Sequence, residues 1–154
     1  ELYNKAVESH GERLVTGSDD FTLQLFYLPE KVPRKQMTGH GKPINHVQFS
    51  PDGRYIVSGS FDKKIKLWDG YTGDFMYTFD GHVGPVYLIS WSVDSRYLVS
   101  ASQDSTLKLW DIKTRKLMMD LPGHADQVYA LDWDINGNYV ASGGKDRQVK
   151  LWTN

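Results

Sequence analysis

The sequence predicts an all-β fold made of about four similar units, each containing four short strands. A motif recurs along the 154 residues at a constant spacing of 42. Within each unit, short runs rich in β-branched and aromatic residues or alternating between apolar and polar residues are typical of strands. Turn-forming Gly, Pro, Asp and Asn separate these runs, and helical periodicity never lasts longer than one turn. These observations together favour a repeat protein built only from strands.

The repeat is recognisable from four residue types that keep their spacing. Gly-His pairs occur at Gly39-His40, Gly81-His82 and Gly123-His124. Asp recurs at Asp20, Asp62, Asp104 and Asp146. Trp recurs at Trp68, Trp110 and Trp152, with Phe26 in the same position. A period of this length is typical of a propeller blade or a solenoid unit, and four antiparallel strands per unit favour the propeller.

Each strand of a unit is predicted from its own pattern, as the second unit illustrates. The four predicted strands cover residues 43–49, 54–60, 64–68 and 74–79. Ile44, Val47 and Phe49 are the apolar anchors of the first strand. The second (RYIVSGS) is β-branched and aromatic, the third (KIKLW) alternates polar and apolar residues up to its Trp, and the fourth is DFMYTF. The turns between them contain Pro-Asp-Gly, Phe-Asp-Lys and Tyr-Thr-Gly.

The period divides the chain into four parts. We expect an incomplete blade at 1–38, whole blades at 39–80 and 81–122, and at 123–154 a blade that lacks its outer strand. The first part is a poor copy, because Lys5 falls where the next units have Val47 and Ile89. Open blade arcs expose apolar faces and unpaired strand edges. We therefore expect these blades to belong to a ring of seven or eight, closed by more of the same chain or by self-association with a second copy.

The pattern GH … SxSxD … LWD resembles the WD-repeat (WD40) family, over nearly the whole chain. The resemblance implies a hydrogen-bonded tetrad of His, Ser, Asp and Trp in each blade. These structural tetrads would be His40, Ser58, Asp62 and Trp68; His82, Ser100, Asp104 and Trp110; and His124, Ser142, Asp146 and Trp152. The last unit departs from the pattern with Gly144 and Thr153. Each buried polar atom of a tetrad would have a partner, which is the condition for burying it.

The resemblance also implies where partners bind. In the family, the residues just after Gly-His and the residue before the tetrad Asp rise on one end of the propeller, here called the top face. By position, the top-face residues are Pro43, Asn45, Phe61, Pro85, Tyr87, Gln103, Gln127, Tyr129 and Lys145. Exposed aromatic residues are good anchors for a partner, although Tyr87 and Tyr129 would also suit packing at the blade top.

Ser, His and Asp in one unit invite comparison with a catalytic triad. A nucleophile is needed once per site, whereas this set occurs three times at identical spacing, so repetition favours a structural role. There is no G-x-S-x-G elbow, no P-loop, no cysteine and no pair of His residues at metal-ligand spacing. We therefore predict that the chain is not an enzyme and has no catalytic residue, cofactor or metal site.

Composition gives no general attraction to nucleic acid or membrane, because the net charge is −1 and the isoelectric point is near 6.6. No apolar run approaches membrane-spanning length. Local basic clusters do occur, at Lys63, Lys64 and Lys66, at Lys113, Arg115 and Lys116, and at Lys145, Arg147 and Lys150. These clusters would either meet phosphates of rRNA or discourage pairing of strand edges.

Some stretches resemble one branch of the family more specifically, the WD-repeat ribosome assembly factors. They include GHVGPVYLISWSVDSRYLVSASQDSTLKLWD and KLMMDLPGHADQVYALDW. This resemblance implies a non-catalytic protein-interaction scaffold in assembly of the large ribosomal subunit. Its partners would be other proteins and the pre-ribosomal particle, with rRNA among the contacts, in the nucleus and nucleolus. The alternative is a WD-repeat scaffold in signalling or ubiquitin ligation, located in the cytoplasm.

Overall fold

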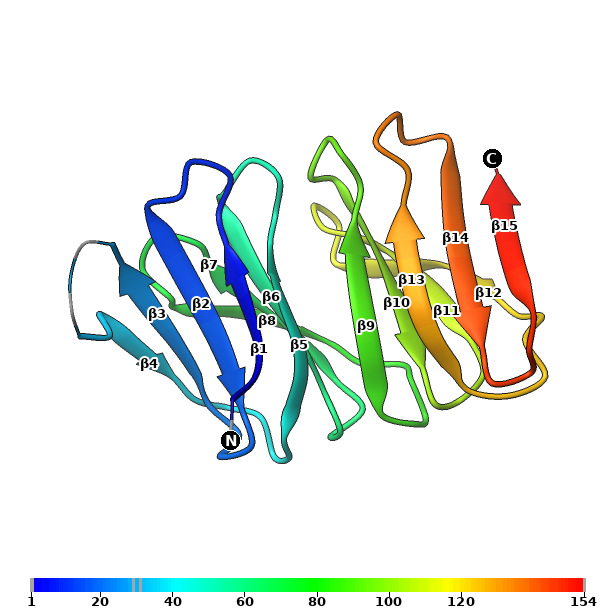
Figure 1. Ribbon diagram of the computed structural model, residues 1–154, viewed down its shortest axis with the longest axis horizontal. Helices are drawn as coiled ribbons and strands as arrows, with labels where there is room; N and C mark the ends of the chain where they lie inside the picture. The colour runs from blue at the N-terminus through cyan, green and yellow to red at the C-terminus, as the bar shows by residue number, and fades with distance from the viewer. Residues whose placement is uncertain (1, 29, 31, 154) are drawn as a thin grey trace.

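Fifteen strands form four antiparallel sheets in the computed structural model, which describes residues 2–28, 30 and 32–153 (Figure 1). These described residues contain no helix, so none of them lies in a helix of the length and apolar character that spans a membrane. The prediction of an all-β fold with repeated four-stranded units is therefore confirmed.

Each sheet is a meander in which consecutive strands pair. The first sheet contains β1 (Leu2–Val7), β2 (Arg13–Ser18), β3 (Leu23–Tyr27) and β4 (Lys35–Met37). The second contains β5 (Ile44–Phe49), β6 (Tyr55–Ser60), β7 (Ile65–Asp69) and β8 (Phe75–Phe79). The third contains β9 (Val86–Trp91), β10 (Tyr97–Ser102), β11 (Leu107–Asp111) and β12 (Lys116–Leu121). The fourth contains β13 (Val128–Trp133), β14 (Tyr139–Gly144) and β15 (Val149–Thr153).

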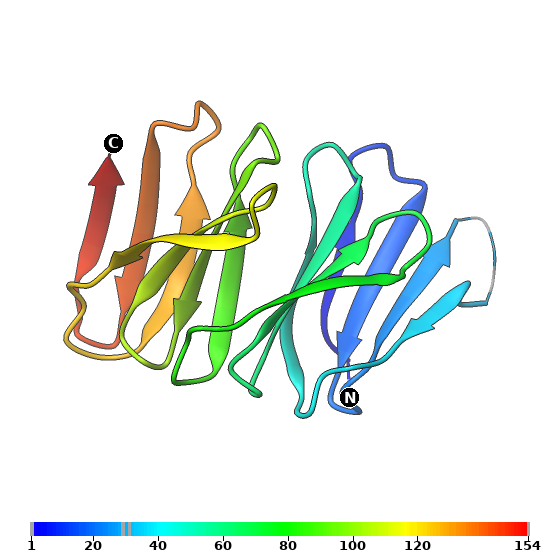
Figure 2. The same cartoon turned by 180° about the vertical axis from the view of Figure 1, so that it is seen from behind.

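The four sheets follow one another as blades of an open propeller arc. The inner strand of each blade packs beside the inner strand of the next, so that β1, β5, β9 and β13 are successive neighbours. They face the viewer in Figure 1, and the view from behind places the outer strands β8 (green) and β12 (yellow) in front (Figure 2). Both ends of the arc are open, and the partial propeller predicted from the repeat is thus confirmed.

Apolar residues fill the three junctions between consecutive blades. At the second junction, Val57 and Ile65 pack against Val86 and Ile89, and all four are at most 2% exposed. A small residue on the second strand lets the next blade approach: a Cβ added to Gly59 would lie 2.9 Å from Val86 and Ile89. Gly17 has the same relationship to Ile44 and Val47 at the first junction. The repeat therefore specifies the junctions as well as the strands.

The first blade has a full set of four strands, although its sequence pattern predicts an incomplete blade. β1 pairs with β2 through backbone hydrogen bonds, and these do not need Val at the position of Lys5. The side chain of Asn4 also accepts a hydrogen bond of 3.5 Å from the N–H of Val47 in the next blade. What distinguishes this blade from the others is the tetrad, since Thr16 and Phe26 stand where the second blade has Ser58 and Trp68.

The fourth blade, with three strands, leaves one apolar face uncovered. Val149 and Leu151 are 84% and 64% exposed. Their equivalents in the second blade, Ile65 and Leu67, are each 1% exposed because the third blade covers them. This face of the fourth blade therefore carries the apolar residues of a blade junction, but no neighbouring blade covers them.

Candidate functional site

One chain of hydrogen bonds crosses the second blade and links the four residues of its predicted tetrad. Nδ1 of His40 lies 2.7 Å from Oδ2 of Asp62, and Nε2 of the same ring lies 2.7 Å from the hydroxyl of Ser58. The indole N–H of Trp68 donates to that hydroxyl at 2.9 Å. A carboxylate only accepts, so a neutral ring protonated on Nδ1, with Nε2 accepting from Ser58, gives every polar atom a partner.

The same arrangement occurs in the next two blades. In the third blade, His82 lies 2.7 Å from both Asp104 and Ser100, and Trp110 donates to Ser100 at 2.9 Å. In the fourth blade, the corresponding distances among His124, Asp146, Ser142 and Trp152 are all 2.9 Å. The structure therefore brings together the members of each of the three predicted sets.

The tetrad carboxylates are held in their charged form. Burial by itself would raise the pKa of Asp62, but hydrogen bonds from His40 and from the N–H groups of Gly41 and Lys64 lower it to about 2. The pKa of Asp104 is also well below its usual value, because hydrogen bonds from His82 and Thr106 outweigh burial. These aspartates therefore accept hydrogen bonds at neutral pH and do not transfer protons there.

The buried position of each serine limits what the Ser-His-Asp sets can do chemically. Ser58 and Ser100 are 0% exposed and Ser142 is 2% exposed. Each hydroxyl oxygen already contacts a histidine nitrogen and an indole N–H, so an incoming carbonyl carbon has no path to it. Among the described residues, no three or more His, Cys, Asp or Glu side chains gather as they would around a metal ion. The geometry suits a brace that ties each outer loop to its sheet.

The top face lies at the lower edge of Figure 1, where the loops between blades and the turns between second and third strands meet. Three of its predicted residues form a continuous aromatic row across three blades. Phe61 meets Tyr87 edge to face with ring centroids 6.4 Å apart, and Tyr87 lies against Tyr129 at 5.3 Å. Because each ring restrains the next, the row is a preorganised surface.

Polar side chains hold the tyrosines of this row in place. The hydroxyls of Tyr87 and Tyr129 both donate to Oε1 of Gln127, at 3.2 Å and 2.9 Å. Partial burial raises the pKa of Tyr87, with Tyr129 contributing, although a hydrogen bond with the side chain of Gln103 opposes the shift. Tyr129 is nevertheless 47% exposed, so a large aromatic surface remains open to a partner.

The other predicted top-face residues mainly support the loops. The carbonyls of Pro43 and Pro85 accept the N–H groups of Phe61 and Gln103, at 3.0 Å and 2.9 Å. Asn45 donates through Nδ2 to the carbonyl of Val86, at 2.9 Å, and so joins the second blade to the third. The exposed amine of Lys145 lies 3.9 Å from a carboxylate oxygen of Asp126.

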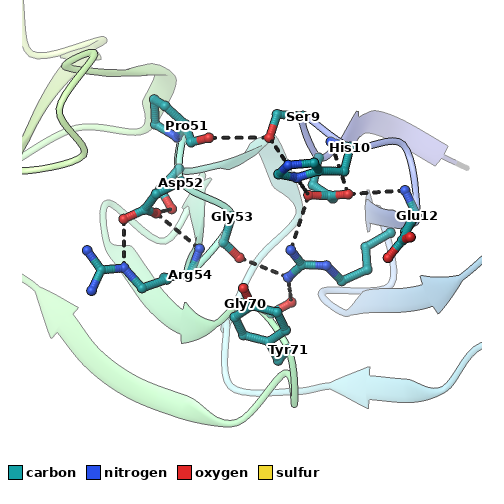
Figure 3. A network of polar contacts seen from close by, with 12 residues as sticks. Ser9, His10, Glu12, Pro51, Asp52, Gly53, Arg54, Gly70 and Tyr71 are labelled. Atoms are coloured by element: carbon teal, nitrogen blue, oxygen red, sulfur yellow. Dashed lines mark hydrogen bonds and ion pairs between the residues drawn. The ribbon is translucent and has the colours of Figure 1, made fainter.

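A buried polar network at the opposite end of the blades was not predicted from the sequence (Figure 3). The guanidinium of Arg13 donates to the carbonyls of Gly53 and Gly70, at 2.8 Å and 2.6 Å, and pairs with Glu8 at 3.1 Å. It also lies 4.1 Å from the centroid of the Tyr71 ring. Arg13 therefore connects the first blade to the second.

The signal for this network was a departure from the repeat. Glu8 and Arg13 occupy the positions of Ser50 and Tyr55 in the second blade. At the next junction, Tyr55 instead stacks on Trp91, with ring centroids 6.3 Å apart and an interplanar angle of 12°. A cation with an ion-pair partner has replaced an aromatic contact at one junction only.

Comparison with known proteins agrees with the fold and with the tetrads' sequence pattern. The model of the WD40 family, described as WD domain, G-beta repeat, matches residues 31–69, 73–111 and 115–153, which is more than half of the chain. The chain therefore belongs to the WD40 family of repeat proteins, and the family resemblance of the sequence is confirmed.

Individual relatives give a more specific likeness. The chain is 59% identical over 80 residues to the Notchless protein homolog of Arabidopsis thaliana, a match covering 51% of this chain and 17% of the relative. It is 56% identical over 83 residues to Ribosome assembly protein 4 of Saccharomyces cerevisiae, covering 51% of this chain and 16% of the relative. It is 42% identical over 59 residues to the U3 small nucleolar RNA-associated protein 15 homolog of Xenopus laevis, covering 38% and 12%. The matched segment thus spans about a sixth of the length of the first two relatives.

Proposed function

We propose that this chain is a non-catalytic interaction scaffold that binds protein partners through the top face, within assembly of the large ribosomal subunit. The observation that carries the proposal is the aromatic row of Phe61, Tyr87 and Tyr129. Rigid, partly exposed aromatic side chains are the residues that contribute most binding energy at protein interfaces. Phe61 lies in a turn, and Tyr87 and Tyr129 lie near the starts of β9 and β13, next to the loops that the tetrads brace.

The assembly role rests on the relatives. Two of them, similar to about half of this chain, are named Notchless protein homolog and Ribosome assembly protein 4. We extend that role to this chain, and with it a nuclear and nucleolar location and a pre-ribosomal particle as the binding partner. The buried tetrad serines support the non-catalytic part of the proposal, because no substrate reaches their hydroxyls.

Capture of particles from a nuclear extract tests the proposal. The chain carrying an affinity tag should recover precursors of the large-subunit rRNA and large-subunit ribosomal proteins. The double variant Tyr129→Ala/Lys145→Glu removes an anchor and reverses a charge on the top face, so we expect at least tenfold less recovery. Tyr139→Ala is the matched control, since Tyr139 is 44% exposed at the opposite end of the same blade.

The outcomes separate the parts of the proposal. Equal recovery by the double variant and the control would place the binding surface elsewhere. Recovery of signalling or ubiquitin-ligase components in place of ribosomal precursors would overturn the assembly role. A melting curve for each variant shows whether a loss of recovery reflects binding or folding.

A further inference from the structure

Two lysines of the first basic cluster, Lys64 and Lys66, form contacts inside the second blade. Lys64 pairs with Asp80 at 3.4 Å, and the amine of Lys66 donates to the hydroxyl of Thr78 at 2.9 Å while lying over the Phe75 ring. These cations are therefore engaged within their own blade.

Four other cations gather around one hollow between the second and third blades. The hollow has a volume of about 350 Å³ and lies at the end of the blades opposite the top face. Its lining includes Arg54, Arg96, Lys113 and Arg115. The single acidic residue of the lining is Asp94, whose Oδ1 already accepts hydrogen bonds from the hydroxyl of Ser92 and the N–H of Arg96. The hollow thus carries an excess of positive charge.

Most of this charge is not neutralised within the chain. Arg54 uses Nε to bind Asp52 at 2.7 Å. The side chains of Arg96, Lys113 and Arg115 are exposed and form no ion pair or side-chain hydrogen bond with any residue that the structure describes. The guanidiniums of Arg96 and Arg115 each lie 5.3 Å from the centroid of a tyrosine ring, which leaves their N–H edges available.

The repeat provides an internal comparison for this hollow, because equivalent residues line the other junctions. At the first junction, Glu12, Tyr71 and Gly73 stand where the second has Arg54, Lys113 and Arg115, whereas the position of Arg96 is again an arginine, Arg54. Arg13 is bound at this junction to backbone carbonyls (Figure 3). The fold therefore does not require cations at the positions of Arg54, Lys113 and Arg115.

Arg115 also has a backbone conformation that is unfavourable for it. Its φ is 60°, in the left-handed region, where the preceding repeat has Gly73 with a φ of 73°. A non-glycine residue in this region costs about 1 kcal/mol. Arg115 therefore occupies a position that suits glycine, at a cost in backbone energy that a change to Gly would remove.

We propose that this hollow binds single-stranded RNA, with backbone phosphates held by Arg96, Lys113 and Arg115. Arginine forks match phosphate oxygens in geometry and charge. The floor of the hollow is apolar, formed in part by Leu67, Met76 and Ile112. A nucleotide combines a phosphate with a flat base that covers such a floor, whereas an acidic peptide would bring carboxylates to it. The proposal deepens the assembly role by adding an RNA contact on the end away from the top face.

The test is a titration of the purified chain with a fluorescein-labelled 20-nucleotide single-stranded RNA, followed by anisotropy at several salt concentrations. Arg115→Gly removes one cation and relieves the backbone, so the protein should remain at least as stable. We expect severalfold weaker binding and a salt slope smaller by about 0.7, the value for one lost phosphate contact. Lys116→Gln is the control, because it removes the same charge just outside the lining.

Unchanged affinity and slope for Arg115→Gly, or an equal loss for Lys116→Gln, would overturn the proposal. A 20-residue poly-glutamate that competes as well as unlabelled RNA would assign the hollow to an acidic peptide instead. The titration contains no ribosomal protein, so its failure leaves the capture experiment on the top face unaffected, and the reverse also holds.

Discussion

Trp110 and Ser100 lie diagonally across the paired strands β11 and β10 of the third blade, and the indole N–H donates to the buried hydroxyl at 2.9 Å. Replacing Trp110 by Phe would retain most of the apolar volume but remove the donor. Because the loss of a buried hydrogen bond costs about 1–2 kcal/mol, we expect the free energy of unfolding to fall by that amount. Trp110→Ala should cost about 3–5 kcal/mol, since it also leaves a cavity.

Chemical denaturation monitored by circular dichroism measures both changes. Tyr139→Phe is the control, because this partly exposed ring should change stability by no more than about 0.5 kcal/mol. A Trp110→Phe protein as stable as the parent would show that the tetrad hydrogen bond does not contribute.

His46 makes stability depend on pH. The ring lies on the inner strand of the second blade, and Nδ1 accepts a hydrogen bond of 3.3 Å from the N–H of Ile89. Burial lowers its pKa from 6.5 to about 4. Below pH 6.5 the unfolded chain therefore binds a proton that the folded chain does not. Stability should fall as pH decreases from 6.5 to 4, by up to about 1.4 kcal/mol per pH unit.

His46→Gln keeps an acceptor but cannot titrate, so the stability of this variant should vary less over the same pH range. Unfolding free energies measured at pH 7, 6, 5 and 4 provide the comparison. Identical pH profiles for parent and variant would exclude His46 as the cause.

The ion pair of Glu8 and Arg13 should behave as a unit. Arg13→Met leaves the carboxylate buried without its cation, at an expected cost of about 3–5 kcal/mol. The double change Glu8→Ser/Arg13→Tyr introduces the residues that the second blade has at these positions, so we expect it to recover most of that loss. A double variant as unstable as Arg13→Met would contradict this expectation.

The uncovered face of the fourth blade should make the chain self-associate. Val149 and Leu151 match residues that are buried at the other junctions, and their exposure favours contact with another sheet face. Light scattering should therefore give a mass above 17.6 kDa at high concentration. Val149→Lys/Leu151→Lys should reduce it, whereas Val83→Lys, at an exposed loop position, should not. A monomer at every concentration would contradict this expectation.

Periodicity was sufficient to predict the strands, because one 42-residue pattern places the same apolar and turn residues in each blade. The partners of Ser58, Ser100 and Ser142 were implied by the resemblance to the WD-repeat family, whose motif recurs here at a constant spacing. The pattern predicted an incomplete first blade, whereas β1 is present and pairs with β2, because backbone pairing tolerates Lys5.

A repeat pattern does not predict features that occur only once in the chain. The Arg13 network depends on two backbone carbonyls far away in the sequence. Every residue has a backbone carbonyl, so the residue types at those positions do not reveal the contact. The basic hollow combines Arg54 and Arg96 with Lys113 and Arg115, whereas adjacency in sequence had grouped the last two with Lys116. Only the packing of one blade on the next shows which charges share a space.

Each junction joins sheets that are consecutive in the chain: β5 packs beside β1, β9 beside β5, and β13 beside β9. During synthesis, a new sheet can dock on the preceding one soon after its 42 residues leave the ribosome, without waiting for distant parts of the chain. At each such stage, the growing end of the arc displays an uncovered sheet face of the kind that Val149 and Leu151 present. A chaperone that protects the growing end of the arc therefore needs to recognise only one type of surface, because each new blade exposes an equivalent face.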